Sequence, residues 1–373
     1  MRWLLIVMAG LCLSGCSTAA YYWQSVHGHM QMLNAARPVD DVLADQQTPA
    51  ALKARLMGSQ RIRSFAATAL KLPDNASYKR YVALARSAVV WNVVAAPELS
   101  LTLKTWCFPV VGCVGYRGYF SEADAQHMAE HLKSDALEVT VYGVPAYSTL
   151  GKMAWLGEFG SDPLLSTFIG YPEGELARLI FHELAHQVVY APGDTMFNES
   201  FATAVERLGG QLWLSSQASP AAQHDYAKFD QRRQSFRALT LNTRSELKAI
   251  YAISQPSDHD EENKPSAGVL HAQPAIKLDK SAQQQSKAAA MQRFKTRYAQ
   301  LKTTWQDGPP TSGYDTWVAK ANNASFGAQA AYDELVPGFE KLFEAQGRDW
   351  QRFYDAVNHL ASLPQKERHA ALQ

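Results

Sequence analysis

The chain has 373 residues, and its 36 lysines and arginines almost balance its 35 aspartates and glutamates. A charge this close to neutral gives no basic field for nucleic acid, so we expect no nucleic-acid partner. Apolar residues make up 47% of the chain, which is enough for one large or two closely packed domains with a substantial core.

The N-terminus has the pattern of a secretory signal. A basic residue, an apolar run over 3–13 and two small residues precede Cys16. That run is too short to span a membrane stably, as is typical of a cleaved signal peptide. Leu13-Ser14-Gly15-Cys16 also resembles a bacterial lipobox, so we expect residues 1–15 to be a lipoprotein signal peptide and Cys16 to carry a lipid anchor to the membrane. An ordinary signal peptide with an incidental cysteine is the alternative.

A lipid anchor at Cys16 predicts a location in the bacterial cell envelope. Ser17 follows it, and no aspartate is present there to retain a lipoprotein at the inner membrane, so we expect the outer membrane, facing the periplasm. Cys107 and Cys113 are then an even pair in an oxidising compartment, which predicts a disulfide bond. A second metal site at these cysteines is the alternative, but they have no histidine neighbours in the sequence.

The N-terminal half changes from helical to extended patterns. Apolar spacing predicts helices over 20–36 and about 48–90. Residues 91–120 contain β-branched and aromatic runs interrupted by proline and glycine, which predicts short antiparallel strands. A helix over about 121–132 and a strand over 138–142 follow.

The C-terminal half is expected to be helical. Long amphipathic patterns cover 222–253 and about 281–305, and further helices are expected over about 315–345 and 348–362, before a polar tail. The composition of the segment at about 254–280 favours a solvated, mobile insertion over a metal site at its acidic tip.

The pattern histidine-glutamate-x-x-histidine occupies residues 182–186. Residues four apart on a helix lie one above the other, roughly 6 Å along the axis, so His182 and His186 can bind the same ion. Glu183 lies one step round the helix and can reach a water molecule instead of the metal, which is the position of a general base. Apolar flanks predict a buried helix that ends just after Tyr190, and buried imidazoles are costly unless they are paired or metal-bound. A solvent-exposed helix with two incidental histidines is the alternative.

A second helix is predicted over about 197–208, with Asp194 or Thr195 as its N-cap and Gly209-Gly210 at its end. Glu199 in its first turn can return to the two imidazoles. Two histidines and one glutamate leave the fourth zinc position for water, as in catalytic sites. An acidic residue that stabilises a helix N-terminus is the alternative for Glu199.

Two neighbours of Glu199 are candidates for supporting roles. Glu206 follows on the same helical face and is a rival ligand or a group that orients a ligand, although it could equally pair with Arg207 at the surface. Asn198 is expected to orient an imidazole through its free ring nitrogen, as metal-bound histidines require.

These motifs resemble those of the gluzincins, the thermolysin-like clan of zinc peptidases, although the interval between the two motifs is shorter here. The chain resembles more closely a bacterial family of predicted aminopeptidases, lipoproteins with the same metal motif. The matching stretches span nearly the whole mature chain: Tyr21-Tyr22-Trp23-Gln24, Cys107 to Cys113, Tyr116 to Phe120, His182 to Gln187, Asn198 to Ala202, Tyr314-Asp315, Asn322-Asn323-Ala324 and Leu360 to Arg368.

The resemblance implies a zinc peptidase with one ion and a peptide substrate. We expect a predominantly helical α+β fold, in which a small antiparallel sheet packs on a zincin-like pair of metal-binding helices. An N-terminal helical and β region would span 16–135, the catalytic core 136–210 and a helical C-terminal region 211–373. In this clan an edge strand beside the metal helix pairs with the extended substrate, and 137–144 or 147–156 are the candidates here.

The sequence differs from the large aminopeptidases of this clan at a residue that determines where the peptide is cut. The large aminopeptidases of this clan carry a glutamate that binds the free amine of the substrate, within a Gly-x-Met-Glu-Asn strand. Ala154 stands at that place here, within Gly151-Lys152-Met153-Ala154-Trp155, and Glu158 could substitute for the missing acid.

For the oxyanion, Tyr314 and Tyr332 are candidate donors and Tyr190 is a weaker one. The sequence thus predicts a zinc-dependent peptidase, in the first place an aminopeptidase. The alternatives are a periplasmic endopeptidase for envelope proteins and a non-catalytic envelope lipoprotein with a vestigial metal site. A damaged motif would mark the latter, whereas ligands and base are intact here.

Overall fold

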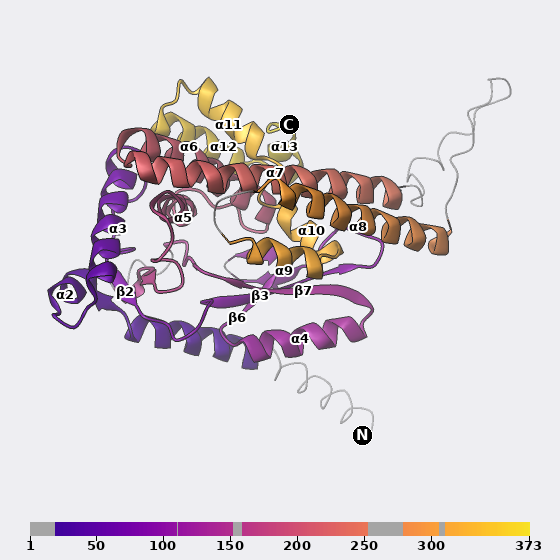
Figure 1. Ribbon diagram of the computed structural model, residues 1–373, viewed down its shortest axis with the longest axis horizontal. Helices are drawn as coiled ribbons and strands as arrows, with labels where there is room; N and C mark the ends of the chain where they lie inside the picture. The colour runs from indigo at the N-terminus through magenta and orange to yellow at the C-terminus, as the bar shows by residue number, and fades with distance from the viewer. Residues whose placement is uncertain (1–18, 110, 152–158, 253–278, 306–309) are drawn as a thin grey trace.

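A three-stranded antiparallel sheet with helices on both faces lies at the centre of the fold (Figure 1). The computed structural model describes residues 19–109, 111–151, 159–252, 279–305 and 310–373. The strand order is β6-β3-β7, where β3 is Val90–Pro97, β6 is Arg117–Tyr119 and β7 is Leu137–Val144. Short antiparallel strands were therefore a correct expectation for this part of the chain.

Side chains alternate between the two faces of this sheet, as the pleat requires. The odd-numbered residues of β3, such as Trp91 and Val93, form a core cluster with helix α4 (Glu122–Ser134). The even-numbered residues Val94 and Ala96 pack with Ala324 of helix α10 (Asn323–Ala330) on the other face. Among the described strands β7 pairs with β3 alone, so it is an edge strand, and 137–144 was one of the two candidates for such a strand.

The N-terminal region departs from the expected long helix over 48–90. Helix α3 spans only Ala50–Thr68, and the rest contains strand β2 (Arg80–Val82) and the start of β3. Lys71 and Tyr78 have positive φ angles of 55° and 64°, which a right-handed helix does not allow. Strand β2 instead joins a second small sheet with β1 (Arg37–Pro38) and β8 (Leu164–Leu165). Residues 19–34 form a helix, and α2 is Val39–Ala44.

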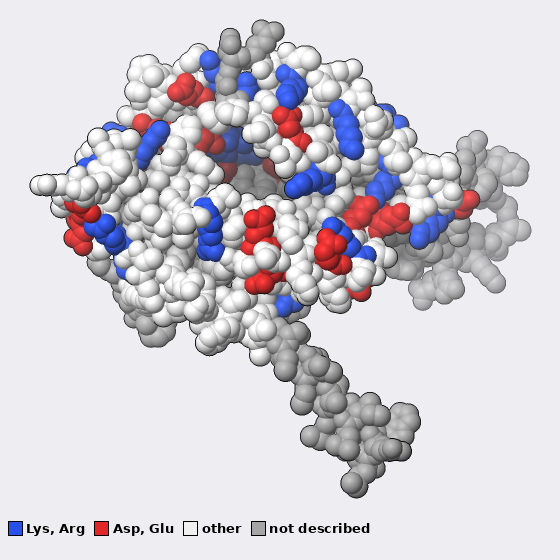
Figure 2. Space-filling model, turned by 60° about the horizontal axis from the view of Figure 1, so that its bottom comes forward, with Lys and Arg blue, Asp and Glu red and all other residues white. Residues whose placement is uncertain are grey.

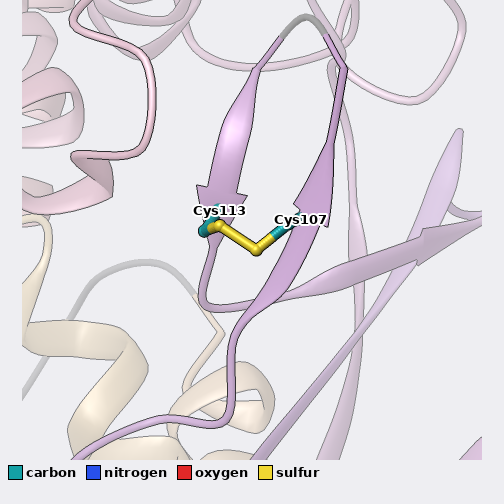
Figure 3. The surroundings of a disulfide bond; sticks show 2 residues. All are labelled: Cys107 and Cys113. Carbon is teal, nitrogen blue, oxygen red and sulfur yellow. A yellow bond between two sulfur atoms is a disulfide. The ribbon is translucent and has the colours of Figure 1, made fainter.

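A two-stranded hairpin carries the disulfide bond (Figure 3). Its strands are β4 (Trp106–Phe108) and β5 (Gly112–Val114), and Cys107 lies directly opposite Cys113 in the ladder, with their Cα atoms 3.8 Å apart. The predicted pairing of these two cysteines is confirmed.

The two helices that carry the histidine-glutamate motif and Glu199 pack against each other. Helix α5 spans Glu173–Ala185 and ends before Tyr190, contrary to expectation, because the chain turns over 186–188. Helix α6 spans Thr195–Ser216 with Asp194 as its N-cap, so Gly209-Gly210 lies inside the helix instead of ending it. A Cβ atom at Gly209 would come within 2.6 Å of Leu70 and 3.1 Å of Phe181, so the glycine permits close packing on α5.

The C-terminal half is helical, which confirms the expected α+β class. Helices α7 (Pro220–Ala252) and α8 (Lys280–Thr303) cover nearly the expected residues, and they run side by side (Figure 1). The single helix expected over about 315–345 is three, because Asn322 forms a capping box that starts a new helix and a turn follows Ala330. The remaining helices are α9 (Ser312–Lys320), α11 (Val336–Ala345), α12 (Trp350–Ser362) and α13 (Gln365–Ala370).

Several expectations fall outside the described residues. The signal peptide and Cys16 do so entirely, and so do Ala154, Glu158 and nearly all of the segment at about 254–280. Among the helices of the described ranges, none combines the length and the apolar character that crossing a membrane demands.

Gly209→Val should destabilise the fold by about 1–3 kcal/mol, because the added methyl groups overpack the contact with Leu70 and Phe181. Gly58→Val in helix α3 is the matched control, since no heavy atom lies within 4 Å of a Cβ at that position. Its unfolding free energy should change by less than about 0.5 kcal/mol, in line with helix propensities. Urea denaturation of both variants measures the difference, and equal effects would contradict the packing role of Gly209.

Candidate metal centre

Helices α5 and α6 bring three ligand groups together. One ligand atom from each of His182, His186 and Glu199 lies within 4.8 Å of the other two. The Nε2 atoms of the two histidines are 3.2 Å and 3.7 Å from Oε2 of Glu199. Two ligands at about 2.0–2.1 Å from a tetrahedral zinc ion are about 3.3 Å apart, so the donor set fits such an ion. The structure thus brings together the three residues expected from the two motifs.

Glu206 orients His182 and is itself held by an arginine. Its Oε2 atom is 3.1 Å from Nδ1 of His182, and its Oε1 atom accepts a hydrogen bond from Arg178. A proton on Nδ1 that is donated to Glu206 leaves the Nε2 lone pair free for a metal. Glu206 therefore holds one imidazole of the candidate site, and it pairs with Arg178 instead of forming a surface pair with Arg207.

Charges in this group leave room for a divalent cation. Burial would raise the pKa of Glu206, but Arg178 and His182 lower that pKa to about 2. Burial would likewise raise the pKa of Glu199, but the two imidazoles hold that pKa well below its ordinary range. Arg178 is paired with Glu206. Burial would lower the pKa of His182, but Glu199 and Glu206 raise that pKa well above its ordinary value, so a proton on this imidazole offsets part of the negative charge when no metal is bound. A divalent ion would take the place of that proton and balance the largely buried Glu183 and Glu199.

His182, His186 and Glu199, here called the metal group, line a cleft of about 800 Å³, here called the metal cleft. Glu183 lines the same cleft. Burial raises the pKa of its carboxyl group, despite the nearby imidazoles of His182 and His186. Figure 2 shows a hollow on this side of the molecule with acidic and basic side chains at its floor, and both kinds line the cleft. A carboxylate beside a cation site, open to a cleft of this size, is suited to deliver and receive protons during hydrolysis.

The three tyrosines expected near the site all line the cleft, but only Tyr332 contacts an imidazole in the structure's described ring pairs. The ring of Tyr332 stacks on the ring of His182, with centroids 6.2 Å apart. Tyr314 also lines the cleft, but its ring contacts are with Phe236 and Trp305, with centroids 4.7 Å and 5.1 Å apart, and not with either imidazole. The weaker candidate, Tyr190, lines the cleft with its hydroxyl 3.5 Å from the carbonyl oxygen of Val111.

Two further tyrosines near Glu199 were missed by the sequence reasoning. Burial and the charge of Glu199 raise the pKa of Tyr116 well above its ordinary value, and raise the pKa of Tyr142 to about 12. Tyr116 lies between β5 and β6, and Tyr142 lies on β7, so both come from segments that are distant in sequence from Glu199. The one signal for Tyr116 was its place in a stretch that resembles the family.

Asn198 does not have the expected role. Its amide nitrogen donates to the carbonyl oxygen of Ala191 at 2.8 Å, and its amide oxygen accepts from the backbone nitrogen of Ala191 at 2.7 Å. The side chain therefore fixes the turn between α5 and α6, and Glu206 is the group that holds an imidazole. The start of α6 is fixed as well, because Asp194 accepts from the backbone nitrogen of Phe197 and contacts His369 at 2.9 Å.

The disulfide hairpin braces the same turn. Gly193 donates its backbone hydrogen to Val111 at the hairpin tip over 3.0 Å. Gly112 and Gly193 both have positive φ angles, of 76° and 81°. A Cβ atom at Gly112 would lie 2.5 Å from the nitrogen of Gly193, so only glycine allows this approach of two backbones.

A buried aspartate lies on the other side of Glu183. Asp162 is 1% exposed and accepts hydrogen bonds from the backbone nitrogen of Thr149 at 2.9 Å and from the Gln187 side chain at 3.2 Å. Burial raises its pKa to about 6, and the charge of Glu183 adds to the increase. This residue was not found from the sequence, because its partners lie far from it in the chain.

Glu206→Gln should weaken zinc binding about 10- to 100-fold, because the amide no longer holds Nδ1 of His182 as a charged acceptor does. Competition with a chromogenic chelator measures the zinc dissociation constant. Glu340→Gln is the control, since Glu340 pairs with Arg207 at 3.8 Å and stands outside the metal group. Equal zinc affinities in both variants would show that Glu206 does not support the ligand.

Asp162→Asn should become progressively more stable than the wild type as the pH rises from 4 to 7. The folded-state pKa of about 6 exceeds the reference value of 3.8, so the wild type loses stability between these two values. A difference of about two pKa units corresponds to about 3 kcal/mol. Urea denaturation of chelator-treated protein at several pH values measures this change, and a difference independent of pH would contradict it.

The chain matches one known protein family over nearly its whole length. A scan against family models matches residues 20–372 to the family described as "Putative aminopeptidase". No match was found among curated proteins or among solved structures. Because the matched range covers nearly all of the 373 residues, this chain belongs to the putative aminopeptidase family.

Proposed function

We propose that this protein is a zinc-dependent peptidase, in the first place an aminopeptidase. The observation that carries the proposal is the convergence of His182, His186 and Glu199, with Glu183 beside them in a cleft. Two histidines and one glutamate leave a coordination position open, which is typical of catalytic zinc sites. Family membership supports a peptide as the substrate.

Each residue of the site has its own role in the proposed hydrolysis. Zinc bound by His182, His186 and Glu199 supplies Lewis acidity, which acidifies water and polarises a carbonyl group. Glu183 removes the proton of the attacking water and then delivers it to the departing amine. Tyr332, which stacks on His182, and Tyr116 are the donors best placed to stabilise negative charge on the carbonyl oxygen.

Strand β7 offers a second point of contact for a peptide. It is the edge of its sheet, and its residue Val144 lines the metal cleft. Backbone hydrogen bonds between an extended peptide and this edge would hold substrates with little dependence on their side chains.

An endopeptidase is the second candidate, and the charges of the cleft favour it. Apart from Glu183, Glu199 and Glu206, two carboxylates line the cleft in the described part of the chain, Glu175 and Asp333. Glu175 accepts a bidentate pair of bonds from Arg233, and Asp333 is paired with Arg207 and Arg237. Neither acid is free to bind the amino terminus of a substrate, which an aminopeptidase requires.

A location at the cell envelope is part of the proposal. The lipobox-like sequence before Cys16 supports a lipid anchor in a bacterial membrane, and we place the protein at the outer membrane, facing the periplasm. The disulfide bond between Cys107 and Cys113 supports an oxidising compartment.

Glu183→Gln should keep zinc near one ion per chain and lower kcat at least 10²-fold, because a neutral amide cannot accept the proton of water. His182→Ala should lose the metal, because two ligands remain. Metal analysis and hydrolysis of an alanine peptide measure both effects. Undiminished hydrolysis by Glu183→Gln would eliminate the proposed base.

Peptides with a free and an acetylated amino terminus distinguish the two candidates. An aminopeptidase should hydrolyse the free peptide at least tenfold faster, whereas an endopeptidase should accept both. A chelator should abolish either activity and added zinc should restore it. Hydrolysis that persists after removal of the metal would contradict both candidates.

A further inference from the structure

A second cavity of about 660 Å³ adjoins the metal cleft. Its walls come from residues 99–105, from the turn over 193–196, from the end of α7 and from α10. Tyr116 and Tyr332 line both cavities, so the two spaces meet at these side chains. Since Tyr332 stacks on His182, the second cavity begins next to the metal group.

One face of the sheet forms a continuous floor under both cavities. Val90 and Asn92 of β3 line the metal cleft, and Val94 on the same face of the strand lines the second cavity. On β7, Val144 lines the metal cleft and Tyr142 lines the second cavity. The distance from Val90 to Val94 is about 13 Å along an extended chain, which is the length of about four peptide residues.

The walls of the second cavity leave space for a peptide chain. On α10 the cavity is lined by the small residues Ala328 and Ala330, and Ala328 is only partly buried, whereas Gly327 packs directly against Leu101 and Leu103. Thr102 and Thr105, from the segment 99–105, also line the cavity and are exposed. Small and polar walls of this kind accommodate a backbone without selecting one large side chain.

The charges of this cavity favour a carboxylate over an amine. Arg244 and Lys248 line it, and both pair with the same carboxylate, Glu334, at 2.8 Å and 3.4 Å. Asp194 is the one acidic side chain of the described lining, and it is already paired with Arg368 and His369. Two cations therefore share one anion, and no free acid is present to bind an amino terminus.

We propose that the second cavity binds the part of the peptide substrate that lies C-terminal to the scissile bond. This inference rests on the proposed peptidase function and adds a substrate class, namely peptides that extend several residues beyond the cleaved bond and end in a free carboxylate. The peptide follows the sheet floor from Val90 and Val144 past Tyr116 and Tyr332, toward Arg244 and Lys248.

Blocking the cavity should remove the advantage of long substrates. In the zinc-loaded wild type, kcat/KM for hexa-alanine should exceed that for dialanine at least tenfold. Ala328→Trp on α10 and Thr105→Trp in the segment 99–105 should each lower the ratio of these two values at least tenfold. Ala289→Trp, at an exposed position of α8, is the matched control and should leave the ratio unchanged. Circular dichroism and thermal melting identify any variant that fails to fold.

Binding measured without turnover separates this inference from the peptidase proposal. In the zinc-loaded Glu183→Gln background, calorimetry should show hexa-alanine binding that Ala328→Trp or Thr105→Trp weakens at least tenfold. This result would support the cavity even if the wild type hydrolysed no peptide, an outcome that would overturn the peptidase function alone. Unchanged binding or an unchanged ratio in both folded variants would overturn the cavity assignment.

A separate experiment tests whether Lys248 contributes to binding the C-terminal carboxylate of the peptide. Lys248→Ala should reduce the preference for hexa-alanine with a free carboxylate over its C-terminal amide at least threefold, measured as the ratio of dissociation constants in the Glu183→Gln background. Lys295→Ala, on the exposed side of α8, is the control. An equal preference in both variants would show that the C-terminal part of the substrate does not end at this wall.

Discussion

The proposed site depends on two largely buried carboxylates, Glu183 and Glu199, that pair with no lysine or arginine in the described part of the chain. Glu206 is paired with Arg178, whereas Glu199 contacts the imidazoles of His182 and His186. Burying such charges is unfavourable unless a cation joins them. A divalent ion bound here would therefore contribute to folding as well as to chemistry, because its binding energy would stabilise the helix pair that presents its ligands.

The positions of the two helices depend on contacts that lie far from the ligands. The turn between α5 and α6 is held by Asn198 from inside and by the disulfide hairpin from outside. Ser200, one residue after Glu199, donates to the carbonyl oxygen of Ala331 and so fixes the approach to Tyr332. Residues from three separate parts of the chain, namely the hairpin, the α5–α6 turn with the start of α6, and the segment at Ala331, thus set the geometry of this site.

The sequence was most informative where spacing along one helix decides geometry. His182, Glu183 and His186 could be assigned because helical periodicity places them on neighbouring faces, and Glu199 because a short turn returns the chain. Tyr116, Tyr142 and Asp162 could not, since strand pairing and burial bring them to the site from separate segments.

The misassigned helix ends have a similar explanation. Apolar spacing over 48–90 fits a helix and a buried strand equally well, and tertiary packing chose the strand for β2. Gly209-Gly210 looked like a helix end, but the surroundings of Leu70, Phe181 and Arg178 demand the absence of a side chain there. Local sequence patterns give the helix or strand propensity of a segment, whereas close contacts with distant segments decide which secondary structure it forms and where that structure ends.

The contact between Gly112 and Gly193 connects the disulfide hairpin to the turn between α5 and α6. The hairpin tip and the turn between the metal-bearing helices touch backbone to backbone, so neither can shift without the other. Breaking the bond between Cys107 and Cys113 would loosen that tip, and with it the spacing between His186 and Glu199. A reducing agent would therefore weaken the binding of an ion held by His182, His186 and Glu199, without approaching any of these side chains.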